Sequence, residues 1–316
     1  MRLAPKVLLA IGSAAVTLLV LEVGARLLDL RSGVFLSPAR DNCLQRSPAL
    51  VMRMRPNCQT ASVIRERGAG SDRETSHARI NALGLRGDEV RDDGSTRILA
   101  IGDSCTWGWN VEQAESYPAI LQSLLDQRFG PGRYEILNAG TPGFTSYQGL
   151  TYLRDEGLAL HPAIVIAGYG FNDSMHFGDI ESRLASDARW MPLLRVDDVL
   201  LDRSRFYRWV RWQARTPLDK STRSPQVPLD KYGRNMTALV ELARAQGAHV
   251  MLLRFAQRGW VQSPYRDLLA KVADEQGVPL VTYDGPRIDR IHPTADGYRA
   301  LAEQIADRLQ AEGWVK

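Results

Sequence analysis

The chain has 316 residues and a mass of 35.2 kDa, and 44% of its residues are hydrophobic, enough to bury a sizeable core. This composition excludes a disordered or fibrous protein. The formal net charge of +4 comes mostly from arginine, and because no run of basic residues occurs, we expect no nucleic-acid partner.

The N-terminus predicts a membrane-spanning helix. Arg2 and Lys6 precede an apolar stretch that starts at Val7 and continues to Leu28, and about 20 such residues span a bilayer. The two cations should stay in the cytoplasm, which places the rest of the chain outside. We therefore expect residues 1–29 to be a single-pass anchor in the inner membrane, with the catalytic domain in the periplasm.

Two alternatives to an anchor remain open for this segment. A cleavable signal peptide fits the small residues of "VGA" at Val23 to Ala25, and the mature protein would then be secreted. A buried core helix is the other alternative, although the flanking charges argue against it. Glu22 and Arg26 lie four residues apart near the outer end, where they can neutralise each other.

Residues 30–95 are irregular and rich in proline, glycine and charge, which predicts an extracytoplasmic spacer with short strands around Val63 and Ile80. Cys43 and Cys58 could form a disulfide bond there or remain two free thiols. Cys105 is left over, and no metal-binding spacing surrounds it.

From residue 96 to 316 strands and helices alternate regularly. The expected strands are Arg97–Ile101, Tyr134–Leu137, Ala163–Ala167, His249–Phe255 and Pro279–Tyr283. Helices are expected around 117–125, 147–158, 236–243, 264–276 and 298–309. Unbroken apolar strands between helices are typical of a parallel sheet that is covered on both faces. We therefore predict an α/β fold with a doubly wound, five-stranded parallel sheet.

Polar residues follow the strands at the edge where such sheets bind ligands. They are Gly102-Asp103-Ser104, Asn138-Ala139-Gly140, Gly170-Phe171-Asn172-Asp173 and Asp289-Arg290-Ile291-His292. Each group alone could be a helix cap or a turn, but together they contain a nucleophile, a base, a carboxylate and amide donors. These are the components of acyl transfer.

Ser104 needs a base, and His292 is a candidate with Asp289 three residues before it; it is preferred because Asn172, beside the aspartate of the rival pair, is expected to have a different role. His176 is the rival, since Asp173 precedes it at the same spacing. When a serine attacks an ester, negative charge develops on the carbonyl oxygen. The expected donors to that oxyanion are the N–H groups of Ser104 and Gly140 and the side-chain amide of Asn172.

These four blocks resemble the SGNH hydrolase superfamily, the GDSL-type esterases and lipases. "GDS" at 102–104, the glycine of "NAGTPGFTS" (Gly140), "GYGFND" with Asn172 and "DRIHP" with Asp289 and His292 match its blocks in order. The resemblance covers about residues 96 to 309. It implies a flavodoxin-like three-layer α/β/α fold and ester deacylation without a metal or cofactor. It also implies Ser104 as nucleophile, His292 as base, Asp289 as the residue that orients it, and an oxyanion hole completed by Gly140 and Asn172.

"INALGLRG" (Ile80 to Gly87) and the apolar N-terminus further resemble a bacterial branch of that superfamily tethered to the outer face of the inner membrane. "GDSCTWG" departs from the commoner "GDSFTFG", because Cys105 stands where a bulky apolar residue is usual. Packing behind the nucleophile is therefore in doubt.

A long insertion at 174–228 interrupts the alternation. Within it Phe206, Trp209, Val210 and Gln213 would share one helical face, which indicates a lid, a surface on anionic lipid, or a helix packed on the core. Three aromatic residues near the strand ends are candidates for the walls of the acyl pocket: Trp107, Trp109 and Phe171.

The sequence thus predicts a serine esterase or deacylase that acts on carboxylic esters of acetyl or short acyl groups outside the cytoplasm. Its substrate would be an ester-bearing glycan, lipid or small molecule. An O-acyltransferase acting on envelope or exported polysaccharide would use the same residues, although Asp-x-x-His after the serine favours hydrolysis. A glycan-binding scaffold without catalysis is the third hypothesis.

Overall fold

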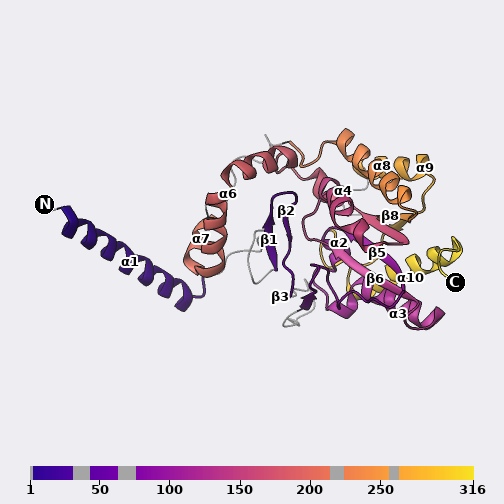
Figure 1. Cartoon of the computed structure of the whole chain (residues 1–316), viewed down its shortest axis with the longest axis horizontal. Coiled ribbons are helices and arrows are strands. Elements are labelled where there is room, and N and C mark those ends of the chain that lie inside the picture. The colour runs from indigo at the N-terminus through magenta and orange to yellow at the C-terminus, as the bar shows by residue number, and fades with distance from the viewer. Residues whose placement is uncertain (1–2, 31–42, 63–75, 214–223, 256–262) are drawn as a thin grey trace.

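A five-stranded parallel sheet forms the centre of the protein (Figure 1). The computed structural model describes residues 3–30, 43–62, 76–213, 224–255 and 263–316. The strands are β5 (Thr96–Gly102), β6 (Tyr134–Gly140), β7 (Ile164–Gly168), β8 (His249–Phe255) and β9 (Leu280–Tyr283). Their order across the sheet is β6-β5-β7-β8-β9, which is the flavodoxin-like order. The predicted fold class and five-stranded parallel sheet are confirmed.

Helices cover both faces of this sheet. On one face lie α3 (Tyr117–Phe129) and α10 (Ala295–Ala311), and on the other lie α4 (Ser146–Asp155), α8 (Leu229–Ala245) and α9 (Pro264–Glu275). Successive strand residues point to opposite faces, so Ile98 and Ala100 of β5 pack with α3 and α10, whereas Leu99 and Ile101 pack in the other core. Continuous apolar strands are required because neither face of the sheet meets water.

Two antiparallel hairpins precede the sheet. They are β1 (Leu44–Ser47) with β2 (Val51–Met54), and β3 (Cys58–Ser62) with β4 (Ser76–Ile80). A disulfide bond joins Cys43 to Cys58, which resolves the alternative that the sequence left open. Buried residues of the hairpins, including Leu44, Val51 and Ile80, share one core with α4 and α8. The strand expected near Val63 ends at Ser62 as β3, and residues 63–75 lie outside the described residues.

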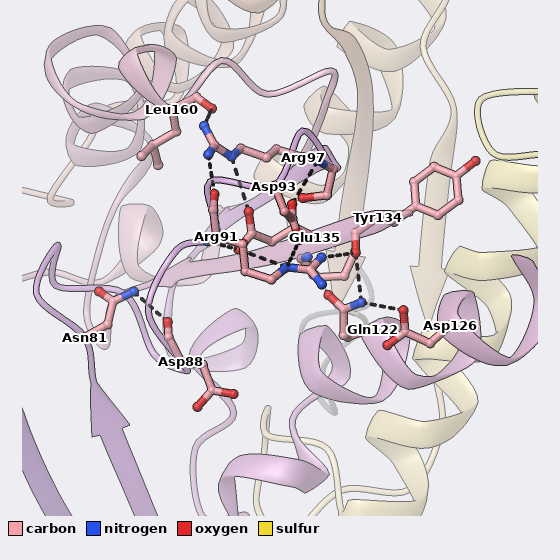
Figure 2. Close-up of polar contacts among 12 residues, drawn as sticks. Asn81, Asp88, Arg91, Asp93, Arg97, Gln122, Asp126, Tyr134, Glu135 and Leu160 are labelled. Atoms are coloured by element: carbon pink, nitrogen blue, oxygen red, sulfur yellow. Dashed lines mark hydrogen bonds and ion pairs between the residues drawn. The ribbon is translucent and has the colours of Figure 1, made fainter. Parts of the chain in front are cut away.

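Side chains close the exposed edge of β6 (Figure 2). Gln122 of α3 donates from Nε2 to the Tyr134 carbonyl and accepts from the Ile136 N–H. Arg91 also donates to the Tyr134 carbonyl, and its own N–H donates to Glu135. An edge strand whose backbone groups are occupied in this way is a poor template for a further strand.

The remaining helices are α1 (Leu3–Leu27), α2 (Ser104–Trp107), α5 (Phe171–Ser174), α6 (Ile180–Arg203) and α7 (Arg205–Gln213), with 3-10 turns η2 (Gln113–Glu115) and η3 (Gly157–Leu160). The predicted insertion, 174–228, thus contains α6 and α7. Of the 24 residues of α6, only Ile180 and Leu201 are buried. The helix that the sequence analysis expected, with Phe206, Trp209 and Val210 on one face, is α7, and the lid, the lipid surface and the core-packed helix stay predictions for it.

Candidate active site

Ser104 begins α2 directly after the carboxyl end of β5. Asp103 is the N-cap of this short helix, and its carboxylate accepts from the Cys105 N–H at 2.8 Å. The neighbouring strand on one side is β7, which leads into Asn172, and on the other side is β6. In a flavodoxin-like sheet the crevice between the first and third strands, here β5 and β7, is where ligands bind.

His292 lies close to Ser104 although 188 positions separate them. It belongs to the loop between β9 and α10, and its Nε2 lies 2.8 Å from the Ser104 Oγ. Its Nδ1 lies 2.7 Å from the Asp289 Oδ2. The structure thus brings the predicted serine, histidine and aspartate into one continuous hydrogen-bonded chain.

Asp289 also fixes the backbone of the histidine loop. Its Oδ1 accepts from the N–H groups of Ile291 and His292 at 2.8 and 2.9 Å. Partial burial raises the pKa of Asp289, but the hydrogen bonds from the His292 side chain and backbone outweigh it and lower the pKa to about 2. The carboxylate is therefore ionised at any physiological pH.

The rival histidine lacks the corresponding partner. His176 is exposed, and the Asp173 side chain turns inward, where its Oδ1 accepts from the N–H and hydroxyl of Ser146. His249 stacks on Trp314 with ring centroids 4.7 Å apart. Asp289 is thus the carboxylate that orients a histidine toward Ser104.

Asn172 presents its side-chain amide beside the turn that carries Ser104. Its Nδ2 donates to the Phe144 carbonyl at 3.0 Å and contacts the Asp103 Oδ2 at 3.3 Å. The amide therefore lies between the loop after β6 and the turn that carries Ser104. Among the described residues the Ser104 N–H has no hydrogen-bond partner and is available to a substrate oxygen.

The N–H of Gly140, which the sequence analysis expected to bind the oxyanion, already has a hydrogen-bond partner. It donates to the Asn138 Oδ1 at 3.0 Å. A Cβ on Gly140 would lie 2.3 Å from the Trp107 nitrogen, so glycine is needed here because the backbone of α2 approaches closely. This N–H is not free to receive an oxyanion.

Gly143, which the sequence analysis missed, presents a free N–H in the same loop. It has φ +84° and is half-exposed, and within the described part of the chain its N–H has no hydrogen-bond partner. The next residue, Phe144, accepts from Asn172. The Pro142-Gly143 pair after a strand was the available signal, because it marks a turn with a left-handed residue.

The three aromatic pocket candidates have different environments. Trp107 is buried, and the Arg86 guanidinium lies 5.0 Å above its ring, so it belongs to the core. Trp109 is half-buried and stacks on His292. Phe171 lines a cavity of about 20 Å³ beside Asp103 and Cys105.

A larger cavity of about 440 Å³ lies beside the edge of β6, next to the residues in Figure 2. It is lined by residues of the 81–91 segment, α3 and β6, and neither Ser104 nor His292 contacts it. Among the described residues no group of three or more histidine, cysteine or carboxylate side chains gathers as a metal site.

Arg86, from the "INALGLRG" segment, is a second residue that sequence reasoning did not single out. Its side chain is buried and donates to the carbonyls of Trp107, Gly108 and Val111 at 2.6, 2.6 and 2.9 Å. It therefore holds the chain that leaves α2. Burial lowers the pKa of Arg86 to about 10, so the guanidinium stays charged at neutral pH.

Two acids of this region, Asp103 beside Ser104 and Asp173 beside Asn172, are buried. Burial raises the pKa of Asp103 to about 6 and that of Asp173 to about 7. Burial also raises the pKa of the Cys105 thiol, which keeps this neighbour of Ser104 protonated and a poor nucleophile. Ser104, not Cys105, has the histidine as its partner.

The sequence model of the GDSL-like lipase/acylhydrolase family matches residues 100–300, which is more than half of the chain. The protein therefore belongs to this family and is an enzyme that hydrolyses ester bonds. No functionally curated protein matches the chain significantly.

Three solved structures illustrate the similarity in fold. The psychrotrophic esterase EstA from Pseudoalteromonas sp. is 16% identical, covering 69% of this chain and 98% of its own, with TM-score 0.46. The lipase/acylhydrolase from Enterococcus faecalis is 17% identical, covering 69% and 96%, with TM-score 0.44. The acetyl xylan esterase AlAXEase is 18% identical, covering 67% and 99%, with TM-score 0.46.

Proposed function

We propose that the protein is a serine esterase that works through an acyl-serine intermediate, with Ser104 as nucleophile, His292 as base and Asp289 as the residue that orients the base. The single observation that carries this proposal is the chain of contacts from the Ser104 Oγ through His292 to the Asp289 carboxylate, at 2.8 and 2.7 Å. A serine hydroxyl is a weak nucleophile unless a positioned base removes its proton.

The acylation step follows from this geometry. The Ser104 Oγ attacks the ester carbonyl carbon while its proton passes to the His292 Nε2, and the ionised Asp289 stabilises the resulting imidazolium through Nδ1. His292 then returns the proton to the leaving alkoxide oxygen as the C–O bond breaks. The alcohol departs, and the acyl group remains on Ser104.

Deacylation reverses the proton transfers. A water molecule attacks the acyl carbon and gives a proton to His292, which returns it to the Ser104 Oγ as the carboxylic acid leaves. In both steps the carbonyl oxygen carries negative charge. We assign its donors to the N–H groups of Ser104 and Gly143 and to the amide of Asn172, whose Nδ2 would exchange its 3.3 Å contact with the Asp103 Oδ2 for the oxyanion, each worth about 3 kcal/mol of barrier. Gly143 replaces Gly140 in this role because the Gly140 N–H is occupied.

The proposed substrates are esters of acetyl or other short acyl groups. The proposed location is the periplasmic face of the inner membrane. In support, Pro5–Leu27 forms a 23-residue apolar helix that contains an 18-residue window of mean hydropathy 2.2, and no residue of that window is buried in the protein.

The test measures hydrolysis of p-nitrophenyl acetate and labelling by a fluorophosphonate probe. Ser104→Ala should abolish both, and His292→Ala should reduce turnover by about 10³-fold or more. His176→Ala is the matched control and should be nearly neutral. Full turnover by Ser104→Ala would refute the proposal. Adding oligosaccharide acceptors to the same assay and measuring acylated sugar against free acid distinguishes hydrolysis from O-acyl transfer, and a glycan-binding scaffold would not label at all.

A further inference from the structure

The helix α6 carries an apolar stripe that the described structure leaves partly exposed. Leu193, Val196 and Leu200 are 61%, 57% and 39% exposed. Their spacing of three and four residues places them on one face of the helix. Arg189 lies one turn before the stripe and Arg203 one turn after it, and among the described residues neither guanidinium has an ionic partner.

The other face of α6 is occupied by the first hairpin. Arg46 of β1 pairs with Asp198 at 2.8 Å and with Asp187 at 3.4 Å, and Arg55 pairs with Asp202 at 3.5 Å. The three aspartates recur at a spacing that places them opposite the apolar stripe. These ion pairs fix the rotation of α6 about its axis, so that the stripe faces away from the protein.

The carboxylate of Glu22 holds the junction of α6 and α7 against the outer end of α1. It accepts from the Ser204 hydroxyl at 2.8 Å and from the N–H groups of Arg205 and Phe206 at 3.0 Å each. Arg26, which pairs with Glu22, also donates to the Arg203 carbonyl. Figure 1 shows α7 beside the C-terminal end of α1. The start of α7 is thus capped by a side chain from the apolar helix.

This junction sets the height of α6 and α7 relative to a bilayer. Glu22 is the first charge after the apolar run, so it must lie where hydrocarbon gives way to headgroups. The groups bonded to Glu22 lie at the same level. The aromatic and basic composition of α7, "RFYRWVRWQ", is typical of helices in that zone.

We propose that α6 and α7 lie in the headgroup region of the membrane, with Leu193, Val196 and Leu200 inserted among anionic lipids and Arg189 and Arg203 paired with their headgroups. This inference rests on the proposed membrane location and adds to it a second contact, which orients the catalytic domain. It also requires that α1 is retained, because cleavage after Ala25 would remove Glu22 and leave the first N–H groups of α7 without their acceptor.

The experiment places a polarity-sensitive fluorophore on the stripe of the full-length protein. Val196→Cys offers one reactive thiol, since Cys43 and Cys58 form a disulfide and Cys105 is buried. The labelled protein is reconstituted in vesicles of phosphatidylcholine with phosphatidylglycerol. We expect blue-shifted emission and quenching by brominated lipid. In the control, Glu303→Cys on the exposed face of α10, the fluorophore should emit as it does in water.

The outcomes separate this inference from the membrane location. If the protein floats with the vesicles but the label at 196 reports water like that at 303, the interfacial surface is refuted and the anchor stands. If the protein does not float with the vesicles, the membrane location fails and the inference fails with it. A blue shift that vanishes when the protein is diluted in excess lipid would show that a second copy covers the stripe, which also overturns the proposal.

The charge component has its own test. Arg189→Gln with Arg203→Gln should reduce the blue shift in vesicles that contain phosphatidylglycerol and leave it unchanged in phosphatidylcholine alone. An equal effect in both vesicle types would refute pairing with anionic headgroups.

Discussion

The indole of Trp109 stacks on the imidazole of His292, with ring centroids 5.9 Å apart and an angle of 29° between the planes. Trp109 is thereby a neighbour of the proposed base that comes from the nucleophile's own segment of the chain. Because an aromatic face attracts a cation, the indole stabilises the positive charge that develops on the imidazole as Ser104 attacks.

Trp109→Ala should therefore lower kcat about 3- to 30-fold and change KM little, since the contact strengthens only when the imidazole is charged. Trp109→Phe, which keeps an aromatic face, should recover most of the loss. Steady-state kinetics on p-nitrophenyl acetate measure kcat and KM of both variants. Trp314→Phe is the control, because Trp314 stacks on His249 and not on His292. A loss confined to KM would show that Trp109 binds substrate and does not act through His292.

Asp289→Asn tests whether the carboxylate selects the tautomer of His292. An amide Nδ2 facing Nδ1 forces the ring proton onto Nε2, which then cannot accept the proton of Ser104. We expect kcat to fall about 10³- to 10⁴-fold with the fold retained, because the amide oxygen can still accept from the N–H groups of Ile291 and His292. Circular dichroism verifies the fold. A loss of only a few-fold would remove Asp289 from the mechanism.

The five parallel strands could be predicted because each is a short, unbroken apolar run, and their bounds differ from the expected ones by at most three residues. The strands β1 and β2 could not. Each has only four residues, too few to show a periodic pattern, and the sequence of β1, "LQRS", is also largely polar.

Local spacing could not decide between His292 and His176, because both follow an aspartate by three residues. The distinction depends on a tertiary contact, the one between Asp173 and Ser146. The sequence also could not show which glycine has a free N–H. The Gly140 N–H donates to the Asn138 side chain, and this contact exists only in the folded loop. An arginine in a turn-rich stretch is expected to be exposed, so the sequence did not predict that Arg86 is buried.

Arg86→Lys should disturb the nucleophile loop. A lysine ammonium cannot reproduce the planar fork that serves Trp107, Gly108 and Val111, so at least one buried carbonyl loses its donor. We expect a loss of about 1–3 kcal/mol in the free energy of unfolding and slower fluorophosphonate labelling of Ser104. Urea denaturation and the labelling rate measure the two effects. Arg79→Lys, at an exposed arginine of β4, is the matched control, and equal behaviour of the two variants would contradict the role of Arg86.

Asp173→Asn should make the protein more stable at neutral and alkaline pH. Burial raises the pKa of Asp173 to about 7 in the folded state, whereas the unfolded value is near 3.8, so the folded state binds the proton more tightly. Stability therefore falls as the pH rises from about 4 to about 7, and the full cost is present above pH 7. At about 1.4 kcal/mol per pKa unit, this cost is at most ~4 kcal/mol.

An asparagine carries no such cost, because it does not titrate and its amide oxygen can still accept from the N–H and hydroxyl of Ser146. Urea denaturation at pH 8 should show the variant to be more stable than the native protein, and at pH 5 the difference should largely disappear. Burial also raises the pKa of Asp103, to about 6. Because Asp103 is present in both proteins, its titration contributes to the stability of both. If the variant differed from the native protein by the same amount at both pH values, the carboxyl of Asp173 would not titrate in this range.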